Sequence, residues 1–331
     1  MSLIPSRLKS FIKDWMLVIG MVTGASLYLV YHSIEPLHAA GPFLENVVTH
    51  VQPALLFLML FLSFCRIEPK DLRPHRWQFW LLLIQGLLYT GLTLLVVWAA
   101  GSDNAFGQFI SRHRIPLEAA MVCLICPTAT ACAVVTGKLG GNMAQAITYT
   151  VFINILVAFL VPLMVPLLYP SGELSFASAF LNILKKVFPL LLLPCAAAWL
   201  LKLVAPRIHS WLCSITDLAF YIWAVALTLA ILMSTRAIVR NEGSPWLLLG
   251  IALASLICCA FQFWAGRRIG DIYSDAGPVT VGQSLGQKNT VFAIWMGYTF
   301  MDPIVSVAGG FYSIWHNCYN SWQLYHHNHK S

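Results

Sequence analysis

Charged residues are scarce in this chain. Only 10% of its 331 residues are Asp, Glu, Lys or Arg, whereas 59% are hydrophobic. A soluble domain carries about 25% charged residues, so the composition excludes an ordinary soluble domain and predicts a protein that crosses the membrane many times. The formal net charge is +7, but the basic residues stand in short loops between apolar runs and form no separate patch. The pattern therefore indicates membrane lipid, and not nucleic acid, as a partner.

A cleavable signal peptide and a paired cysteine motif are also lacking. Residues 1–14 are basic and amphipathic, and the apolar run after them continues as a full span, which is not the pattern of a signal peptide. The 9 cysteines are scattered and stand mostly in predicted helices. Cys123 and Cys126 have CxxC spacing but no partner pair, so we interpret them as small packing residues. We therefore expect no metal site and no cofactor.

Acid and base groups are missing from the apolar interior. The apolar runs between residues 77 and 168 and between residues 246 and 324 contain no Asp or Glu away from their ends, and Glu118 comes nearest. An enzyme needs a constellation of acid, base or nucleophile. The sequence therefore predicts that the protein is not an enzyme and has no catalytic residues, and a non-transporting membrane receptor remains an alternative.

Ten apolar runs are long enough, at about 20 residues, to cross a bilayer as helices. We therefore predict an all-α polytopic membrane protein and treat residues 1–331 as one transmembrane domain of a transporter. The ten predicted spans are Trp15–Tyr31, Leu44–Phe64, Trp77–Ala99, Ile115–Val135, Met143–Leu168, Phe180–Leu201, Leu212–Thr235, Trp246–Gly266, Val279–Thr299 and Pro303–Leu324.

Two of these spans, the fourth and the ninth, contain polar or small residues where a membrane helix is normally apolar. The fourth contains Cys126–Ala133 and the ninth contains Gly282–Thr290. One interpretation is that both are kinks with small residues for close helix packing. However, Lys288 is too costly in hydrocarbon for packing alone, and paired interruptions in two halves are typical of a transporter's binding site. We expect spans 4 and 9 to be unwound near Thr128–Ala131 and Ser284–Gln287 and to cross.

The positions of the two interruptions also predict the organisation of the chain. Ten spans divide into five-helix repeats, residues 1–170 and 171–331, each interrupted in its fourth span. An odd number of spans in each half makes the repeats inverted. Most loop Lys and Arg residues fall on one side, so we predict both termini in the cytoplasm and an integral multi-pass protein of the plasma (inner) membrane. The exceptions are Arg112, Arg114, Arg236 and Arg240.

The sequence resembles the bile acid:sodium symporter family, in particular its bacterial homologues. The similar stretches are CPTATACAVVTGKLGGN, the following TYTVFINILVAFLVPLMVPLL, and LGQKN in span 9. The resemblance implies a panel bundle of spans 1, 2, 6 and 7 and a core bundle of spans 3–5 and 8–10. It also implies organic-anion transport, with two sodium ions beside the crossing of the interrupted helices.

The residues at the family's sodium sites differ in this chain. Cys132 and Ala133 stand in place of Ser and Asn, and Ala146 stands in place of a hydroxyl. In span 9 the family has a Glu and a Gln where this chain has Ser284 and Lys288. Thiols and methyl groups are poor ligands for a hard cation, which prefers oxygen. The kept residues, or their nearest substitutes, give a reduced set of candidate ion ligands: Thr150, Ser284, Gln85 and Cys132.

With the carboxylate lost at Ser284 and a lysine gained at Lys288, the chain replaces the bound cations by a covalently attached positive charge. We predict that it balances an anionic substrate in the role that sodium plays in the family. Burial disfavours a charged amine, so binding of an anion is expected to be linked to uptake of a proton. The predicted substrate-binding residues are Lys288, Asn289, Gln287, Gln283, Ser284, Thr128, Thr130 and Gln85.

The sequence thus predicts a secondary active transporter of a bile-acid-like or other small carboxylate or sulfonate by alternating access. We expect it to be independent of the family's two sodium sites, with sodium as a cofactor only in the alternative of a symporter whose ligands have shifted. In that alternative Gln283, one residue before the family's Glu, would supply a ligand. We expect a monomer or homodimer.

Overall fold

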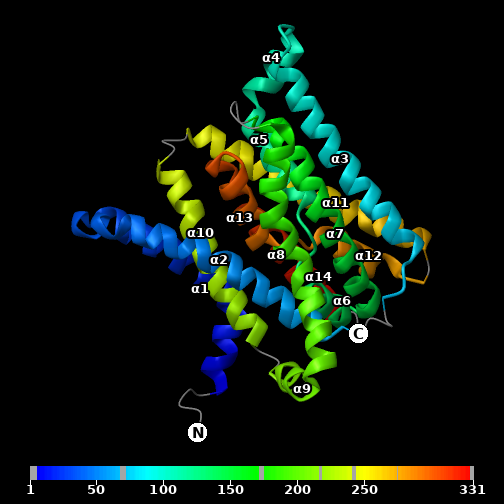
Figure 1. The fold of residues 1–331 in the computed structure, drawn as a ribbon. Helices are drawn as coiled ribbons and strands as arrows, with labels where there is room; N and C mark the ends of the chain where they lie inside the picture. Colours follow the sequence, from blue (N-terminus) through cyan, green and yellow to red (C-terminus); the bar gives the residue numbers. More distant parts are fainter. Residues whose placement is uncertain are drawn as a thin grey trace.

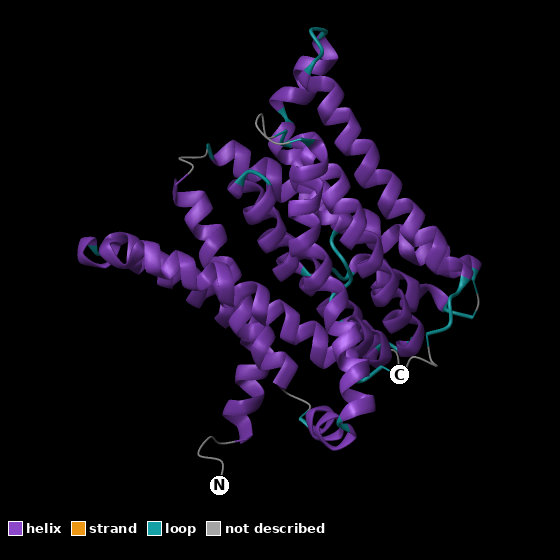
Figure 2. Ribbon diagram, viewed as in Figure 1, coloured by secondary structure: helices purple, strands orange, loops and turns teal. Residues whose placement is uncertain are grey.

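The computed structural model describes residues 6–67, 72–170, 175–215, 218–240, 244–273 and 275–328, and these form helices joined by loops (Figures 1 and 2). The predicted termini themselves, residues 1–5 and 329–331, lie outside the described residues. The helices of the first half are α1 (Ser6–Ser33), η1 (Glu35–Ala40), α2 (Gly41–Phe64), α3 (Arg76–Ala100), α4 (Ala105–Arg112), α5 (Arg114–Ile125), α6 (Cys132–Lys138) and α7 (Met143–Leu168). Those of the second half are α8 (Phe176–Val204), α9 (Pro206–Ser214), α10 (Leu218–Arg240), α11 (Pro245–Ile272), α12 (Gly277–Gly286), α13 (Thr290–Phe300), η3 (Pro303–Ser306) and α14 (Val307–Asn328).

The predicted class, an all-α protein that crosses the membrane several times, is confirmed. Six helices of the described chain are long and apolar enough to cross a membrane. Two shorter apolar helical stretches are Val18–Ser33 and Thr290–Phe300. The six long ones are Leu44–Phe64, Arg76–Ala100, Met143–Leu168, Phe176–Val204, Tyr221–Arg240 and Pro245–Ile272.

Helix packing separates two groups of helices. In the first group, α1 packs on α10, and α2 packs on both α8 and α10. In the second, α11 packs on α12, α5 and α14, and α3 packs on α5 and α7. The groups are joined by contacts of α7 with α8 and of α10 with α13, α14 and η3.

The centre of the molecule lies in the second group. Residues 280–297, from α12 through the loop into α13, are all buried. Figure 2 shows loop segments running through the interior of the helical bundle, where they are surrounded by helices. The predicted interruption of span 9 lies in this segment and is therefore enclosed by protein. Irregular backbone is tolerated at membrane depth under this condition.

Three predicted boundaries are wrong because short helices flank the long ones. α9 has Pro206 in its first turn, a residue that suits a helix start. It includes Leu212–Ser214, which we predicted as the start of a span. The long helix of that span, α10, begins at Leu218. α4 was predicted as loop, but Asn104 caps it by accepting a hydrogen bond from the Gly107 N–H at 2.7 Å. The last predicted span starts as the separate 3-10 turn η3, at Pro303.

Candidate functional site

The first interruption separates α5 from α6 over residues 126–131. Proline lacks an N–H and disfavours helical backbone at the residue before it, so Pro127 ends α5 at Ile125. The expected unwinding at Thr128–Ala131 is therefore correct but begins two residues earlier.

The second interruption separates α12 from α13 and consists of Gln287–Asn289. The expected range, Ser284–Gln287, is wrong at its start, because Ser284 still belongs to α12. Glutamine and serine side chains do not by themselves stop a helix. The new helix starts where Asn289 caps it, its Oδ1 accepting a hydrogen bond from the Phe292 N–H at 3.2 Å.

The two interruptions lie side by side and pair through their backbones. Thr128 and Lys288 form an isolated antiparallel bridge. The Ala129 N–H donates to the Gln287 carbonyl at 2.9 Å, and the Asn289 N–H donates to the Pro127 carbonyl at 2.8 Å. The pairing satisfies backbone groups that neither helix can satisfy, which is essential where water is excluded.

Side chains reinforce this pairing. The Thr128 hydroxyl donates to the Ser284 carbonyl at 2.8 Å, and the Cys126 thiol donates to the Asn289 carbonyl at 2.8 Å. Thr128 and Cys126 are both fully buried. The interpretation of Cys126 as a packing residue is therefore incomplete, because its thiol also holds the loop that begins α13.

Lys288 is enclosed at this meeting point, with 1% of its surface exposed. Within the part of the chain that the structure describes, no atom accepts a hydrogen bond from its Nζ. The titratable side chains with the largest influence on it are the cysteines Cys126, Cys123, Cys132 and Cys258. Lys288 forms no ion pair with a carboxylate among the described residues. The position also follows the C-terminal end of α12, where the helix dipole favours a cation.

Two of the predicted glutamines bind helices next to the interruptions. Gln85 of α3 donates its Nε2–H to the Leu124 carbonyl at 2.7 Å and accepts a hydrogen bond from the Tyr149 hydroxyl. Gln283 of α12 donates to Asn320 Oδ1 at 2.9 Å and to the Gln323 side chain in α14. The amide of Gln283 is thus engaged with α14, whereas Gln85 ties α3 and α7 to the end of α5.

The remaining predicted substrate-binding residues lie in one or the other of the two interruptions. Gln287 and Asn289 are buried in the second interruption, and each has a side-chain amide atom without a described partner: Gln287 Oε1 and Asn289 Nδ2. Thr130 is half-buried in the first interruption.

Among the predicted ion ligands, Cys132 and Ser284 lie together, although they come from opposite halves of the chain. The Cys132 sulfur is also 3.8 Å from the Thr136 hydroxyl. The Thr150 hydroxyl donates to the Ala146 carbonyl within α7 at 3.0 Å. The groups at these positions are therefore thiols and hydroxyls, and they include no carboxylate.

Several polar residues around the interruptions were missed. The Tyr312 hydroxyl donates to the Gly286 carbonyl at 2.7 Å, at the very end of α12, and accepts a hydrogen bond from Gln262 at 3.1 Å. Asn320 and Gln323 bind Gln283 from α14. Their spacing of three residues, which puts side chains on one face of a helix, was the available signal.

A second polar cluster lies where α5 begins. Glu118, which is fully buried, pairs with Arg114 Nε at 2.6 Å and accepts a hydrogen bond from the Tyr169 hydroxyl. Burial, together with the hydrogen bond to Glu118, raises the pKa of Tyr169 well above its ordinary value. The same hydroxyl accepts a hydrogen bond from the Asp302 N–H at 3.0 Å, so the cluster joins α5 and the end of α7 to the loop before η3. A cavity of about 510 Å³ adjoins it.

These features define a polytopic membrane protein with two interrupted helices that meet inside the bundle. The model of the sodium bile acid symporter family matches residues 53–242, which is more than half of the chain. The chain therefore belongs to the sodium bile acid symporter family, and it is a membrane transporter of this type. The match includes the first interruption and ends before the second. No curated protein matches the chain significantly.

Proposed function

We propose that the protein is a secondary active transporter of an organic anion, and that Lys288 takes the place of the family's sodium ions. The observation that carries the proposal is the enclosure of Lys288 between the two interruptions, with no ion pair and no hydrogen-bond acceptor for its Nζ among the described residues. A buried cation without a fixed counter-charge favours an anionic ligand. The substrate class is a bile-acid-like molecule or another small carboxylate or sulfonate.

The remaining proposed ligands are the groups that stay unpaired at the crossing. Gln287 Oε1 and Asn289 Nδ2 are buried without described partners. Buried polar atoms without partners are costly, so such atoms are where a ligand gains most by binding. Thr130 and Ser284 complete the proposed site, and Gln85 of α3 and Gln283 of α12 support it.

The finer architecture is part of the same proposal. We propose ten membrane-crossing units in two inverted repeats, residues 1–170 and 171–331, with α5–α6 and α12–α13 each forming one interrupted span. The packing of α1, α2, α8 and α10 supports a panel that moves against the core. The proposed orientation has both termini in the cytoplasm at the plasma (inner) membrane, in a monomer or homodimer.

A sodium symporter with shifted ligands is the alternative. It needs Gln283 to contribute an oxygen near Ser284. The Gln283 Nε2 is engaged with Asn320 and Gln323 in α14, whereas its Oε1 is buried without a described partner. A shift of one residue along a helix also turns a side chain by about 100°. This rotation favours the lysine proposal, and the sodium comparison described next separates the two.

Binding of a labelled bile acid to the purified protein tests the proposal. We expect the same dissociation constant in sodium chloride and in choline chloride at equal ionic strength, because Lys288 supplies the positive charge. Affinity that requires sodium would overturn the lysine proposal and favour the shifted-ligand alternative. No binding of any bile acid or small carboxylate in either salt would overturn the substrate class.

A further inference from the structure

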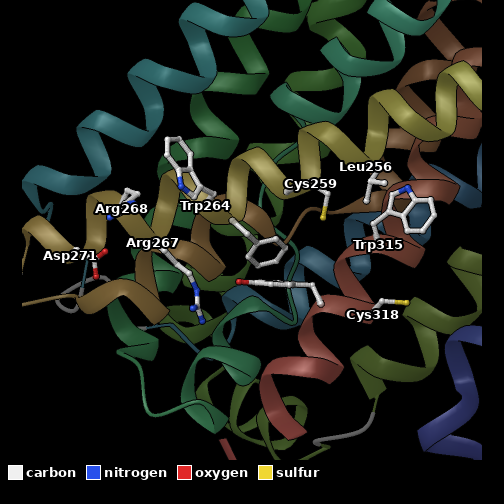
Figure 3. Close-up of a pocket in the computed structure, with 11 residues that line it drawn as sticks. Leu256, Cys259, Trp264, Arg267, Arg268, Asp271, Trp315 and Cys318 are labelled. Atoms are coloured by element: carbon white, nitrogen blue, oxygen red, sulfur yellow. The ribbon is translucent and has the colours of Figure 1, made fainter. Parts of the chain in front are cut away.

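A groove between α11 and α14 has the features of a phospholipid site. It encloses a cavity of about 570 Å³ (Figure 3). One end is apolar, with Leu256 and Trp315, whereas the other end holds three charged residues near the end of α11. The charged residues are Arg267, Arg268 and Asp271.

The apolar wall faces outward from the bundle. Trp264 is 58% exposed and Leu256 is 39% exposed, and neighbouring Ile257 on the same helix is also exposed. In a membrane protein such a face contacts lipid chains. Phe263 forms the inner wall, and its ring packs so closely on Gly286 that a Cβ there would lie 2.4 Å from the ring. The groove thus reaches the end of α12.

Arg267 is held in a fixed position at the charged end. Its stem passes Gly282, where an added Cβ would lie 2.8 Å from Arg267 Cγ. Its guanidinium stands 5.9 Å from the centre of the Tyr319 ring, and that ring in turn lies 4.4 Å from Phe263. Figure 3 shows the Arg267 side chain extending from α11 beside the groove. Packing therefore fixes the position of the Arg267 side chain, which is pre-organised for binding.

Within the part of the chain that the structure describes, the charges at this end form no ion pair. No described carboxylate forms an ion pair with Arg267 or Arg268, although Asp271 follows within one helical turn. Guanidinium groups bind phosphate oxygens strongly, and basic pockets between membrane helices on the cytoplasmic side bind lipid headgroups. The predicted orientation puts both arginines on the cytoplasmic side.

We propose that this groove binds one phospholipid with a primary ammonium in its headgroup. Arg267 and Arg268 take the phosphate, Asp271 takes the ammonium, and an acyl chain lies along Phe263, Trp264 and Leu256. A glycerol headgroup offers Asp271 no positive charge and leaves it beside the phosphate. The charged end of the groove therefore discriminates phosphatidylethanolamine from phosphatidylglycerol.

Native mass spectrometry of the delipidated protein, titrated with phosphatidylethanolamine or phosphatidylglycerol, tests this proposal. We expect the parent to bind phosphatidylethanolamine more tightly. The double variant Arg267→Gln/Arg268→Gln should bind it about thirtyfold more weakly, since each of the two basic residues near a membrane surface contributes about 1 kcal/mol. The control Arg207→Gln, which removes an exposed arginine of α9, should bind like the parent.

Asp271→Asn tests the headgroup separately. It should remove the preference between the two lipids and leave a protein with the parent's melting temperature, because Asp271 is exposed. Three results would each overturn the proposal: equal lipid binding by the parent and the double arginine variant, tighter binding of phosphatidylglycerol by the parent, or a dimer without lipid that Trp264→Ala abolishes.

Discussion

At the scale of single residues, we propose that Lys288 makes this transporter independent of sodium. The buried site offers thiols, hydroxyls and amides, and a lysine stands where the family has a glutamine. A lysine amine is a compact charge that changes protonation readily when buried, so it can respond to the charge of a ligand. Binding an anion and binding a proton are then linked events.

Lys288→Gln should weaken binding of an anionic ligand by at least about 2 kcal/mol, or about thirtyfold in the dissociation constant, because a buried charge partner is lost. In the parent the anion favours the protonated amine, so affinity should fall as pH rises. In the variant affinity should not depend on pH in this way. Isothermal titration at several pH values, with exposed Lys138→Gln as the control, measures both effects.

An unchanged affinity and pH profile in Lys288→Gln would show that Lys288 is not the counter-charge of the substrate. The anion would then have to be held by other groups of the cavity. A loss of affinity in Lys138→Gln equal to that in Lys288→Gln would show an unspecific charge effect.

Glu118 is a second buried residue whose side-chain interactions we expect to matter, in this case for stability. Glu118→Ala should lower the free energy of unfolding by about 2 kcal/mol, because Arg114 and Tyr169 lose a charged acceptor. The Arg114 side chain is 36% exposed, so water replaces part of the loss. Thermal unfolding in detergent measures the change in the free energy of unfolding. The exposed variant Asp103→Asn is a control that should change it by less than about 0.5 kcal/mol. Equal stabilities of both variants would contradict a structural role of the pair.

At the scale of helices, the interruptions are held by a few identifiable groups. Pro127 ends α5, and Asn289 begins α13. Backbone hydrogen bonds across the pair then join the two loops. Each half-helix therefore has a defined end that points into the centre of the bundle, where the dipoles and Lys288 meet.

Asn289→Ala should lower the free energy of unfolding by about 1 kcal/mol, since the N-cap of α13 is lost. Asn104→Ala removes the same kind of cap from α4, at the edge of the molecule, and should cost a similar amount. Only Asn289→Ala should also reduce binding of a labelled bile acid, because its loop carries Lys288. A reduction of the same size in Asn104→Ala would mean that the caps act through stability alone.

Much of this element-level structure could be predicted from local sequence. The scarcity of charge and the lengths of the apolar runs predict the long helices, and proline and the polar run locate both interruptions to within about three residues. The exact start of the second could not be predicted, because Gln283 and Ser284 fit a helix as well as a loop. α4 and α9 were missed because both stand in segments that were treated only as connections.

The candidate site could be predicted only in part, since side-chain partners depend on packing between distant helices. The polar run identified Lys288 and Asn289, which lie at the meeting point. It did not reveal that Gln283 binds α14, that Cys126 bonds to the Asn289 carbonyl, or that Tyr312 contacts the end of α12. These contacts join residues that are far apart in sequence and carry no local pattern.

At the scale of the whole molecule, we propose that the panel formed by α1, α2, α8 and α10 and the core around the interruptions are the two bodies of an alternating-access mechanism. The Arg236–Glu45 ion pair, at 2.7 Å, joins α10 to α2 inside the first body. The groove between α11 and α14 lies on the second. In the proposed mechanism the fixed lysine takes the place of a bound cation, and binding of the substrate itself sets the equilibrium between the two access states.

Uptake of a labelled bile acid into proteoliposomes tests this account most directly. With the purified protein reconstituted in one orientation, uptake is compared with an inward sodium gradient and with sodium replaced by choline on both sides. We predict equal initial rates, and a rate near that of empty liposomes for Lys288→Gln in both conditions. Uptake by the parent that depends steeply on sodium, as expected for two ions carried per substrate, would contradict the account.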